Sequence, residues 1–401
     1  LDDREHLTVF LRKSIRATRW FYERVENRSR AAFFQRLASF FRFVKRCPSS
    51  IEWWRVELDE KLWLWTILAG RMDLHFPVAL QHESESEVLS KIAHEFLTSY
   101  DYRQEWQGAL AGRMSTAFDT ADTVPIVMAS EQNYLMHLSV AISSIVAQSS
   151  FSRNYDFVVI VDFDVTPATI SKFRQIENGH SNISIRFRDI RKDVFMPLIS
   201  NFSRNLHLTL STYYRLAAPY ILPHDKCLWL DSDLIAFEDV STLFDVDVCD
   251  CMIGGCRSLS ANDPELYAPI WIDSIKHLED MGWKNHGNYI NAGVLIMNLS
   301  LMRERNVAIE LFEACSRNSF TFCDQDCINL VLQDSIHYLE GKWNFVISGK
   351  IKKSCGGGMS SIPSQIRHPA GIWHYTGREK PWNHQFGHLS AMWWKYARLS
   401  P

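Results

Sequence analysis

The 401-residue sequence lacks any apolar run of the roughly 18 residues that a membrane helix needs, and its longest candidate covers only residues 62–70. It also lacks a signal-peptide pattern at its start. These two absences favour a cytoplasmic location. Its nine cysteines include no repeated Cys-x-x-Cys pairs, which argues against a zinc ribbon and predicts free thiols. Disorder is excluded, because aromatic residues make up 13% of the chain.

Charge is unevenly distributed along the chain. The net charge is −3, yet residues 1–50 contain 12 Lys and Arg against 5 Asp and Glu. Such a basic, aromatic-rich start fits two interpretations: a surface for anionic lipid or acidic glycan, or ordinary helices with solvated arginines. Residues 1–115 read as an α-helical module, since Phe33, Leu37, Phe40 and Val44 fall on one helix face.

The pattern changes after a stretch of small and acidic residues at 115–123. Short apolar runs at 124–129, 157–161, 183–187 and 227–230 alternate with helical stretches, one of them begun by Pro167. Strands alternating with helices predict an α/β domain over residues 120–385, with a mostly parallel sheet covered by helices.

Residues 386–401 form an amphipathic tail. Leu389, Trp393 and Tyr396 share one face of the helix that this segment predicts. That face suits packing on the N-terminal helices, which we favour, or contact with a membrane interface.

Two carboxylates follow the fourth apolar run directly. Asp231 and Asp233 are two residues apart at a strand end, so they point to the same side. Ligands of parallel sheets bind at this edge, and two close carboxylates repel unless a cation such as Mg²⁺ or Mn²⁺ lies between them. The plain alternative is a strand end that faces solvent.

Three later motifs decide between these alternatives. They begin at Asn291 (Asn-Ala-Gly), Asp324 (Asp-Gln-Asp) and His374 (His-x-x-Gly-x-x-Lys-Pro-Trp). Taken singly, Asp324 could cap a helix and His374 could be a core histidine. With the Asp pair and the preceding segment around Arg215, they occur in an order that resembles glycosyltransferase family 8 over residues 123–385.

The resemblance implies a GT-A fold and a retaining transfer of hexose from UDP-galactose or UDP-glucose, as in bacterial lipooligosaccharide galactosyltransferases. It implies a divalent metal, Mn²⁺ or Mg²⁺, held by Asp231, Asp233 and His374. Two carboxylates and an imidazole leave positions for diphosphate oxygens, whose charge the metal would neutralise.

The same resemblance assigns roles to further residues. Gln325, with Asp324, would act at the reacting carbon; an amide suits stabilisation of an oxocarbenium-like transition state better than nucleophilic attack. Glu131 stands where the family commonly has Asp, which leaves uracil as the expected base. The remaining residues expected to contact the donor nucleotide or its sugar are Ala129, Asn133, Tyr134, Arg215, Ser232, Asn291, Ala292, Gly377 and Lys380.

We therefore expect a metal-dependent glycosyltransferase that acts on a hydroxyl of a glycan, glycoconjugate or protein. The alternatives are a nucleotide-sugar hydrolase or nucleotidyltransferase on the same fold, and a non-catalytic UDP-sugar-binding scaffold. No nucleic-acid partner is expected, and peripheral membrane contact would run through the N-terminal helices or the tail. The glycines at 356–358 fit a flexible loop or a lid over the donor.

Overall fold

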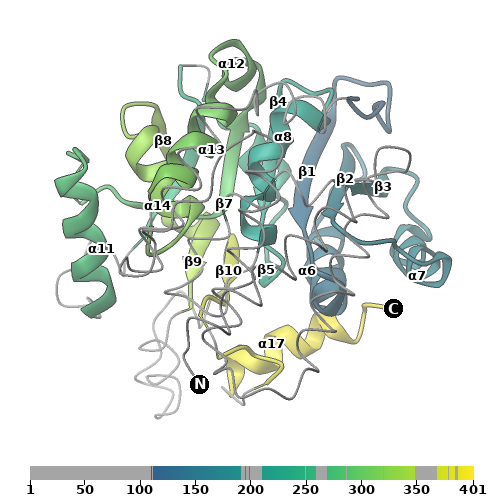
Figure 1. Ribbon diagram of the computed structural model, residues 1–401. Coiled ribbons are helices and arrows are strands. Elements are labelled where there is room, and N and C mark those ends of the chain that lie inside the picture. Colours follow the sequence, from purple (N-terminus) through teal and green to yellow (C-terminus); the bar gives the residue numbers. More distant parts are fainter. Residues whose placement is uncertain are drawn as a thin grey trace, which may run out of the picture. The chain divides into compact units, whose positions relative to one another are not determined.

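The computed structural model describes residues 110, 112–190, 195, 198, 210–248, 250–258, 269–285, 287–318, 320–347, 368–377, 379–383 and 387–401. These residues belong to a compact unit that spans 103–401 (Figure 1). Nearly all of the helical module predicted for residues 1–115 lies outside the described residues, as do the basic first 50 residues and the glycines at 356–358.

A mixed sheet forms the centre of the unit. In the described part of the chain it has seven strands. In spatial order they are β3 (Ile183–Asp189), β2 (Asn154–Val161), β1 (Thr123–Ala129), β4 (Lys226–Leu230), β7 (Ile290–Asn298), β6 (Ile253–Arg257) and β8 (Ile336–Tyr338). Only β7 runs against the others, because it pairs antiparallel with both β4 and β6. The predicted α/β class with a mostly parallel sheet is thus confirmed.

The reversed direction of β7 has a local consequence. Leu230 at the end of β4 pairs with Val294, and the Asp231 amide donates to the Gly293 carbonyl at 2.8 Å. The carboxyl end of β4 therefore meets the beginning of β7, so the Asp231 and Asn291 motifs become neighbours although 60 residues separate them in the sequence.

A second, three-stranded sheet adjoins the first and was not predicted. It consists of β5 (Leu234–Ala236), β10 (Ile372–His374) and β9 (Phe345–Val346). His374 pairs in register with Leu234 of β5 and with Val346 of β9. This pairing carries His374 to the segment that joins β4 to β5, where Asp231 and Asp233 lie.

Helices surround the two sheets. The α-helices are α6 (Leu135–Val146), α7 (Pro167–Glu177), α8 (Ala218–Ile221), α9 (Ser241–Phe244), α11 (Pro269–Asp280), α12 (Leu299–Glu304), α13 (Val307–Arg317), α14 (Asp324–Val331) and α17 (His388–Ala397). The 3₁₀ helices are η2 (Gln132–Tyr134), η4 (Leu210–Ala217) and η6 (Gly341–Asn344). Local chemistry fixes several starts: Pro167 opens α7 after a Thr166 cap, and the Asn298 side chain caps α12.

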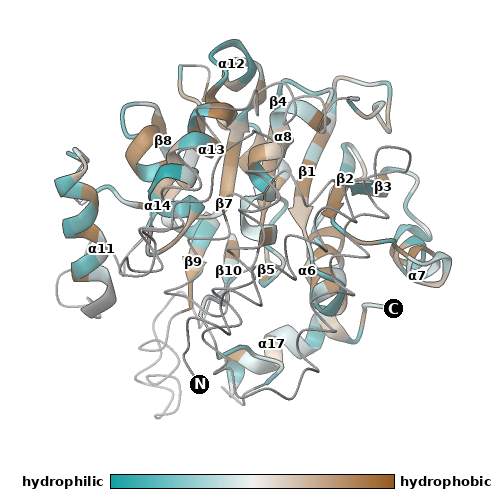
Figure 2. Ribbon diagram, viewed as in Figure 1, coloured by the Kyte–Doolittle hydropathy of each residue, from teal (hydrophilic) through white to brown (hydrophobic). Residues whose placement is uncertain are grey.

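The core lies on the faces of the central strands. Strands β1, β2 and β7 are almost wholly buried, and Figure 2 shows β7 coloured as hydrophobic along most of its length. Helix α7, at the open edge, carries a mostly hydrophilic surface in the same view. None of the helices in the described ranges has the length and apolar character of a membrane span. The described cysteines are free thiols, as predicted.

The tail helix α17 packs on the same unit, beside α6 (Figure 1). Leu389, Trp393 and Tyr396 share a face as predicted and are at most 2% exposed. They join a cluster with Trp373 and Tyr375 of the β10 segment. This face therefore packs on residues of the 103–401 unit. The N-terminal helices, on which we expected it to pack, lie largely outside the described residues.

Candidate active site

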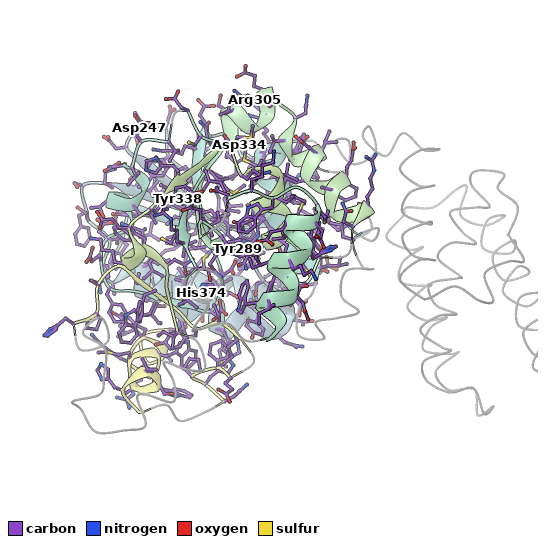
Figure 3. All side chains as sticks on the ribbon, turned by 90° about the vertical axis from the view of Figure 1, so that its left-hand side faces the viewer. Asp247, Tyr289, Arg305, Asp334, Tyr338 and His374 are labelled. Carbon is purple, nitrogen blue, oxygen red and sulfur yellow. The ribbon has the colours of Figure 1, made fainter. Side chains whose placement is uncertain are left out.

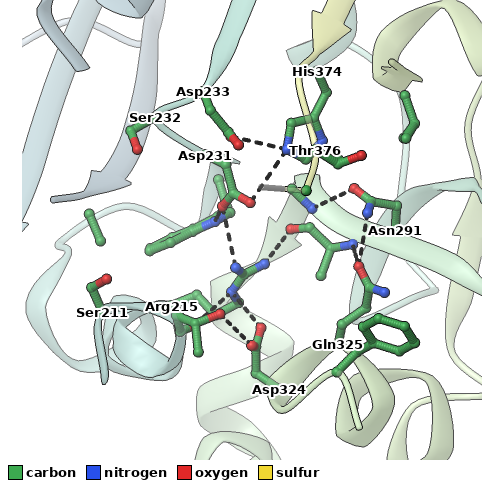
Figure 4. A pocket seen from close by; sticks show the side chains of 18 of the residues that line it. Ser211, Arg215, Asp231, Ser232, Asp233, Asn291, Asp324, Gln325, His374 and Thr376 are labelled. Carbon is green, nitrogen blue, oxygen red and sulfur yellow. Dashed lines mark hydrogen bonds and ion pairs between the residues drawn. The ribbon is translucent and has the colours of Figure 1, made fainter. Parts of the chain in front are cut away.

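One pocket of about 540 Å³ lies where β1 and β4 end and β7 begins. Its walls come from segments far apart in the sequence, including η4, α14 and β10 (Figure 4). The structure brings every site residue predicted from the sequence to this pocket except Asn133. The lining residues are Ala129, Ser130, Glu131, Tyr134, Ser211, Thr212, Arg215, Trp229, Asp231, Ser232, Asp233, Ser258, Trp271, Asn291, Ala292, Gly293, Phe322, Asp324, Gln325, Val346, His374, Thr376, Gly377 and Lys380.

Asp231, Asp233 and His374 form the part of the pocket suited to a metal. Each offers a ligand atom, and all three atoms lie within 4.8 Å of one another. His374 Nε2 is 3.1 Å from Asp233 Oδ1 and 3.8 Å from Asp231 Oδ2. Adjacent ligands of a six-coordinate ion with bonds near 2.1 Å stand roughly 3 Å apart. The donor set and its spacing therefore fit Mg²⁺ or Mn²⁺.

Glycine at position 293 makes room for the histidine. A Cβ atom there would overlap Cε1 of His374 and would lie 2.7 and 2.9 Å from its ring nitrogens. His374 itself is 3% exposed. The small residue in the Asn-Ala-Gly motif is thus required by the imidazole that packs against the β7 backbone.

Lys380 supplies positive charge beside the carboxylates. Its Nζ donates to Asp233 Oδ2 at 2.5 Å and to the Tyr375 carbonyl at 2.7 Å. Burial alone would raise the pKa of Asp233, but Lys380 and His374 together bring it far below its ordinary value. Asp233 is therefore an anion at neutral pH, which is the form that binds a metal.

Arg215 connects the metal-binding residues to the opposite wall. From η4 its guanidinium reaches Asp231 Oδ1 at 3.3 Å, Asp324 Oδ2 at 2.8 Å and the Ala292 carbonyl (Figure 4). The Trp229 indole donates to the same Asp231 oxygen at 2.9 Å, and Arg215 stands 4.9 Å from the Trp229 ring. These contacts fix the direction in which Asp231 points.

Asp324 is the first residue of α14 and is 2% exposed. Burial raises its pKa to about 6, although Arg215 and a 2.7 Å hydrogen bond from Thr212 oppose the rise. At neutral pH it is therefore ionised, and its charge is balanced by Arg215. A carboxylate held in this way can accept hydrogen bonds from sugar hydroxyls.

Gln325 lies next to Asn291 and Ala292 (Figure 4). Its Oε1 accepts from the Asn291 amide at 2.9 Å and from the Ala292 backbone at 3.0 Å. Its Nε2 donates to the Tyr289 hydroxyl at 3.0 Å. Both lone pairs of the carbonyl oxygen are engaged, which makes this oxygen a poor nucleophile.

The nucleotide end of the pocket follows β1. Ala129, Glu131 and Tyr134 line it. The short helix η2 turns Asn133 outward, so this residue is exposed and is not brought to the pocket. Ser232 lies between the two aspartates, and Gly377 has φ of +79°, a backbone conformation that favours glycine.

Several lining residues were not singled out from the sequence. Trp271 of α11 and Phe322 stack with ring centroids 4.0 Å apart, and Trp229, Thr212 and Ser258 are also new. They fall between motifs or are single residues in apolar segments, so the sequence carries little signal for them. The sequence does carry a signal for Trp229, because it stands two residues before Asp231. Alternate residues of a strand point to the same side, so the Trp229 indole faces the Asp231 carboxylate.

Comparison with known proteins agrees with this geometry. The family model for glycosyl transferase family 8 matches residues 125–385. Glycosyltransferase GlyF of Streptococcus pneumoniae is 25% identical over 278 residues, which is 68% of this chain. The match spans only 61% of GlyF itself.

Solved structures of glycosyltransferases share the fold. The galactosyltransferase LgtC, solved in complex with donor and acceptor sugar analogues, has a TM-score of 0.55 at 22% identity, covering 69% of this chain and 96% of LgtC. The bifunctional glycosyltransferase WbbM has a TM-score of 0.57 at 21% identity, covering 86% of this chain and 64% of WbbM. The predicted GT-A fold is thereby confirmed.

Proposed function

The chain belongs to glycosyltransferase family 8, and on this premise we propose that it transfers galactose or glucose from a UDP-sugar to a hydroxyl of a glycan, glycoconjugate or protein. The reaction would depend on Mn²⁺ or Mg²⁺ and would retain the anomeric configuration. The observation that carries this proposal is the convergence, in one pocket, of a metal-suited triad with the Arg215–Asp324 pair and Gln325.

Asp231, Asp233 and His374 would hold the metal. The bound cation would supply Lewis-acid stabilisation of the charge that develops on the departing diphosphate. Lys380, at the edge of the same cluster, would add a second positive charge on the diphosphate. Glu131 and Tyr134 would hold the base at the far end of the pocket.

The remaining wall would orient the hexose. The Asp324 carboxylate, fixed by Arg215, and the Asn291 amide are the groups placed to bind sugar hydroxyls. During transfer the bond from the anomeric carbon to UDP breaks and a bond from the acceptor oxygen forms on the same face. The acceptor proton passes to the departing diphosphate. Because both lone pairs of Gln325 Oε1 are engaged, Gln325 would act through its dipole on the developing positive charge.

The first test is nucleotide release from a panel of UDP- and GDP-sugars with Mn²⁺. We expect slow release of UDP from one sugar, abolished by EDTA. Asp233→Asn should reduce the rate at least about 100-fold, because it removes a ligand charge. The matched control is Asp225→Asn, since Asp225 precedes β4 and its side chain is 84% exposed.

Each other outcome contradicts a different part of the proposal. Full-rate hydrolysis that no acceptor accelerates would make the protein a nucleotide-sugar hydrolase. Pyrophosphate release from UTP would make it a nucleotidyltransferase. Absence of both UDP binding and Mn²⁺ binding would indicate a non-catalytic protein.

A further inference from the structure

A continuous series of hydrogen bonds runs from the wall of the pocket into the protein through the side-chain amides of Asn291, Gln325 and Asn344, and two backbone groups determine its direction. A backbone N–H can only donate. The Ala292 N–H lies 3.0 Å from Gln325 Oε1, and the Gly293 N–H lies 3.0 Å from Asn291 Oδ1. Those two side-chain atoms must therefore be oxygens, which fixes the orientation of both amides.

Toward the metal-suited triad the series continues through Asn344, the last residue of η6. Asn344 Nδ2 donates to Asn291 Oδ1 at 2.8 Å, since that oxygen can only accept. The Asn344 oxygen then faces His374 Nδ1 at 3.0 Å. An amide oxygen accepts only, so Nδ1 of His374 must carry a proton. In the neutral ring the lone pair is therefore on Nε2, the nitrogen that faces Asp231 and Asp233.

In the other direction the series passes through Gln325 to the protein interior. The Asn291 amide donates to Gln325 Oε1, and Gln325 Nε2 donates to the Tyr289 hydroxyl. Tyr289 donates in turn to Asp326 Oδ1 at 2.5 Å. Tyr289 and His374, labelled in Figure 3, lie toward the two ends of the series and are both buried.

We propose that Asn344 is a positioning residue with two functions: it holds His374 as the Nδ1–H tautomer that can bind a metal, and it orients the Asn291–Gln325 amide pair. This inference rests on the proposed metal site. Asn344 is 4% exposed, so its amide has no access to bulk water in exchange for these partners. A histidine ligand whose other nitrogen lacks such a partner typically loses metal affinity.

The tautomer can be read directly. In long-range ¹⁵N–¹H NMR spectra with Mg²⁺, the wild-type His374 ring should show a protonated Nδ1 and an unprotonated Nε2. The His374 signals are assigned by their loss in His374→Gln. A protonated Nε2 in the Mg²⁺-bound wild type would overturn the proposal without any need for a variant of Asn344.

Two variants separate the functions of Asn344. Asn344→Ala should weaken Mn²⁺ binding, measured by calorimetry, about 10- to 100-fold. Asn344→Asp keeps an acceptor for Nδ1–H, so its Mn²⁺ affinity should remain near that of the wild type. It loses the donor to Asn291, so its turnover should still fall.

Asn182→Ala is the matched control, because Asn182 is also buried and donates to two backbone carbonyls, those of Ser150 and Arg153. It should lower stability without changing Mn²⁺ affinity. Equal affinity in Asn344→Ala and wild type would overturn the inference. No Mn²⁺ binding by the wild type would instead contradict the proposed function.

Discussion

Residue 293 must be glycine because the imidazole of His374 occupies the space that a side chain would need. We expect Gly293→Ala to displace His374, since its Cβ would overlap the ring. Mn²⁺ affinity should fall at least about tenfold, as for other changes that misplace a histidine ligand. Calorimetric titration checks this. Gly341→Ala is the control, because no atom lies within 4 Å of a Cβ at Gly341, and it should bind Mn²⁺ as the wild type does.

The raised pKa of Asp324 predicts that the stability of the protein depends on pH. Its pKa is about 6 in the native protein against an ordinary 3.8. Between these values the native state binds more protons than the unfolded state, so this group lowers the free energy of unfolding as pH rises. The difference in unfolding free energy between wild type and Asp324→Asn should fall by about 2 kcal/mol from pH 4 to pH 6. Urea denaturation at several pH values measures it, and a flat or rising difference would contradict the raised pKa.

At the scale of elements, α17 offers two adjacent tryptophans with opposite environments. Trp393 is 1% exposed, and its ring centroid lies 5.1 Å from that of Trp382. Trp394, by contrast, is 46% exposed. We expect Trp393→Ala to reduce the unfolding free energy by about 3–5 kcal/mol through loss of buried contacts. Trp394→Ala should cost less than about 1 kcal/mol. Equal losses in denaturant unfolding would show that this helix does not pack as described.

The elements also differ in how well the sequence predicts them. Strands such as β2 and β4 are apolar segments that the sequence located to within a few residues, and it also placed the start of α7 at Pro167. Strands β5, β9 and β10 have three residues or fewer. A segment of this length is too short to show the alternation of apolar and polar residues that marks a strand. Its structure is decided by pairing with segments that are distant in the sequence.

The same contrast holds for the site. Motif order predicted Asp231, Asp233, His374 and Gln325, which the structure gathers around one pocket. It did not predict Asn344, which lies in no motif and matters only through its hydrogen bonds to His374 and Asn291. Single buried amides of this kind are identified by three-dimensional contact alone.

At the scale of the molecule, the described residues that line the pocket all lie between 129 and 380. We therefore expect a fragment of residues 103–401 to bind Mn²⁺ with the same affinity as the full chain and to unfold cooperatively. Calorimetry and denaturant unfolding check both points. The matched truncation is a fragment of residues 103–383, which lacks α17 and exposes Trp373 and Tyr375. It should be markedly less stable, and equal stability would contradict the packing of α17.

The reversed strand β7 and the late strand β10 also determine when the pocket can form during synthesis of the chain. Asp231 reaches its neighbour Gly293 only after β7 has paired with β4, and Lys380 lies 147 positions from Asp233. Contacts between such distant segments form after long loops close, and here one of them requires Lys380. A ribosome-bound chain from which residue 374 has not yet emerged has only two side chains of the Asp231, Asp233 and His374 triad and no complete site. The site would therefore form only after residue 374 has emerged from the ribosome.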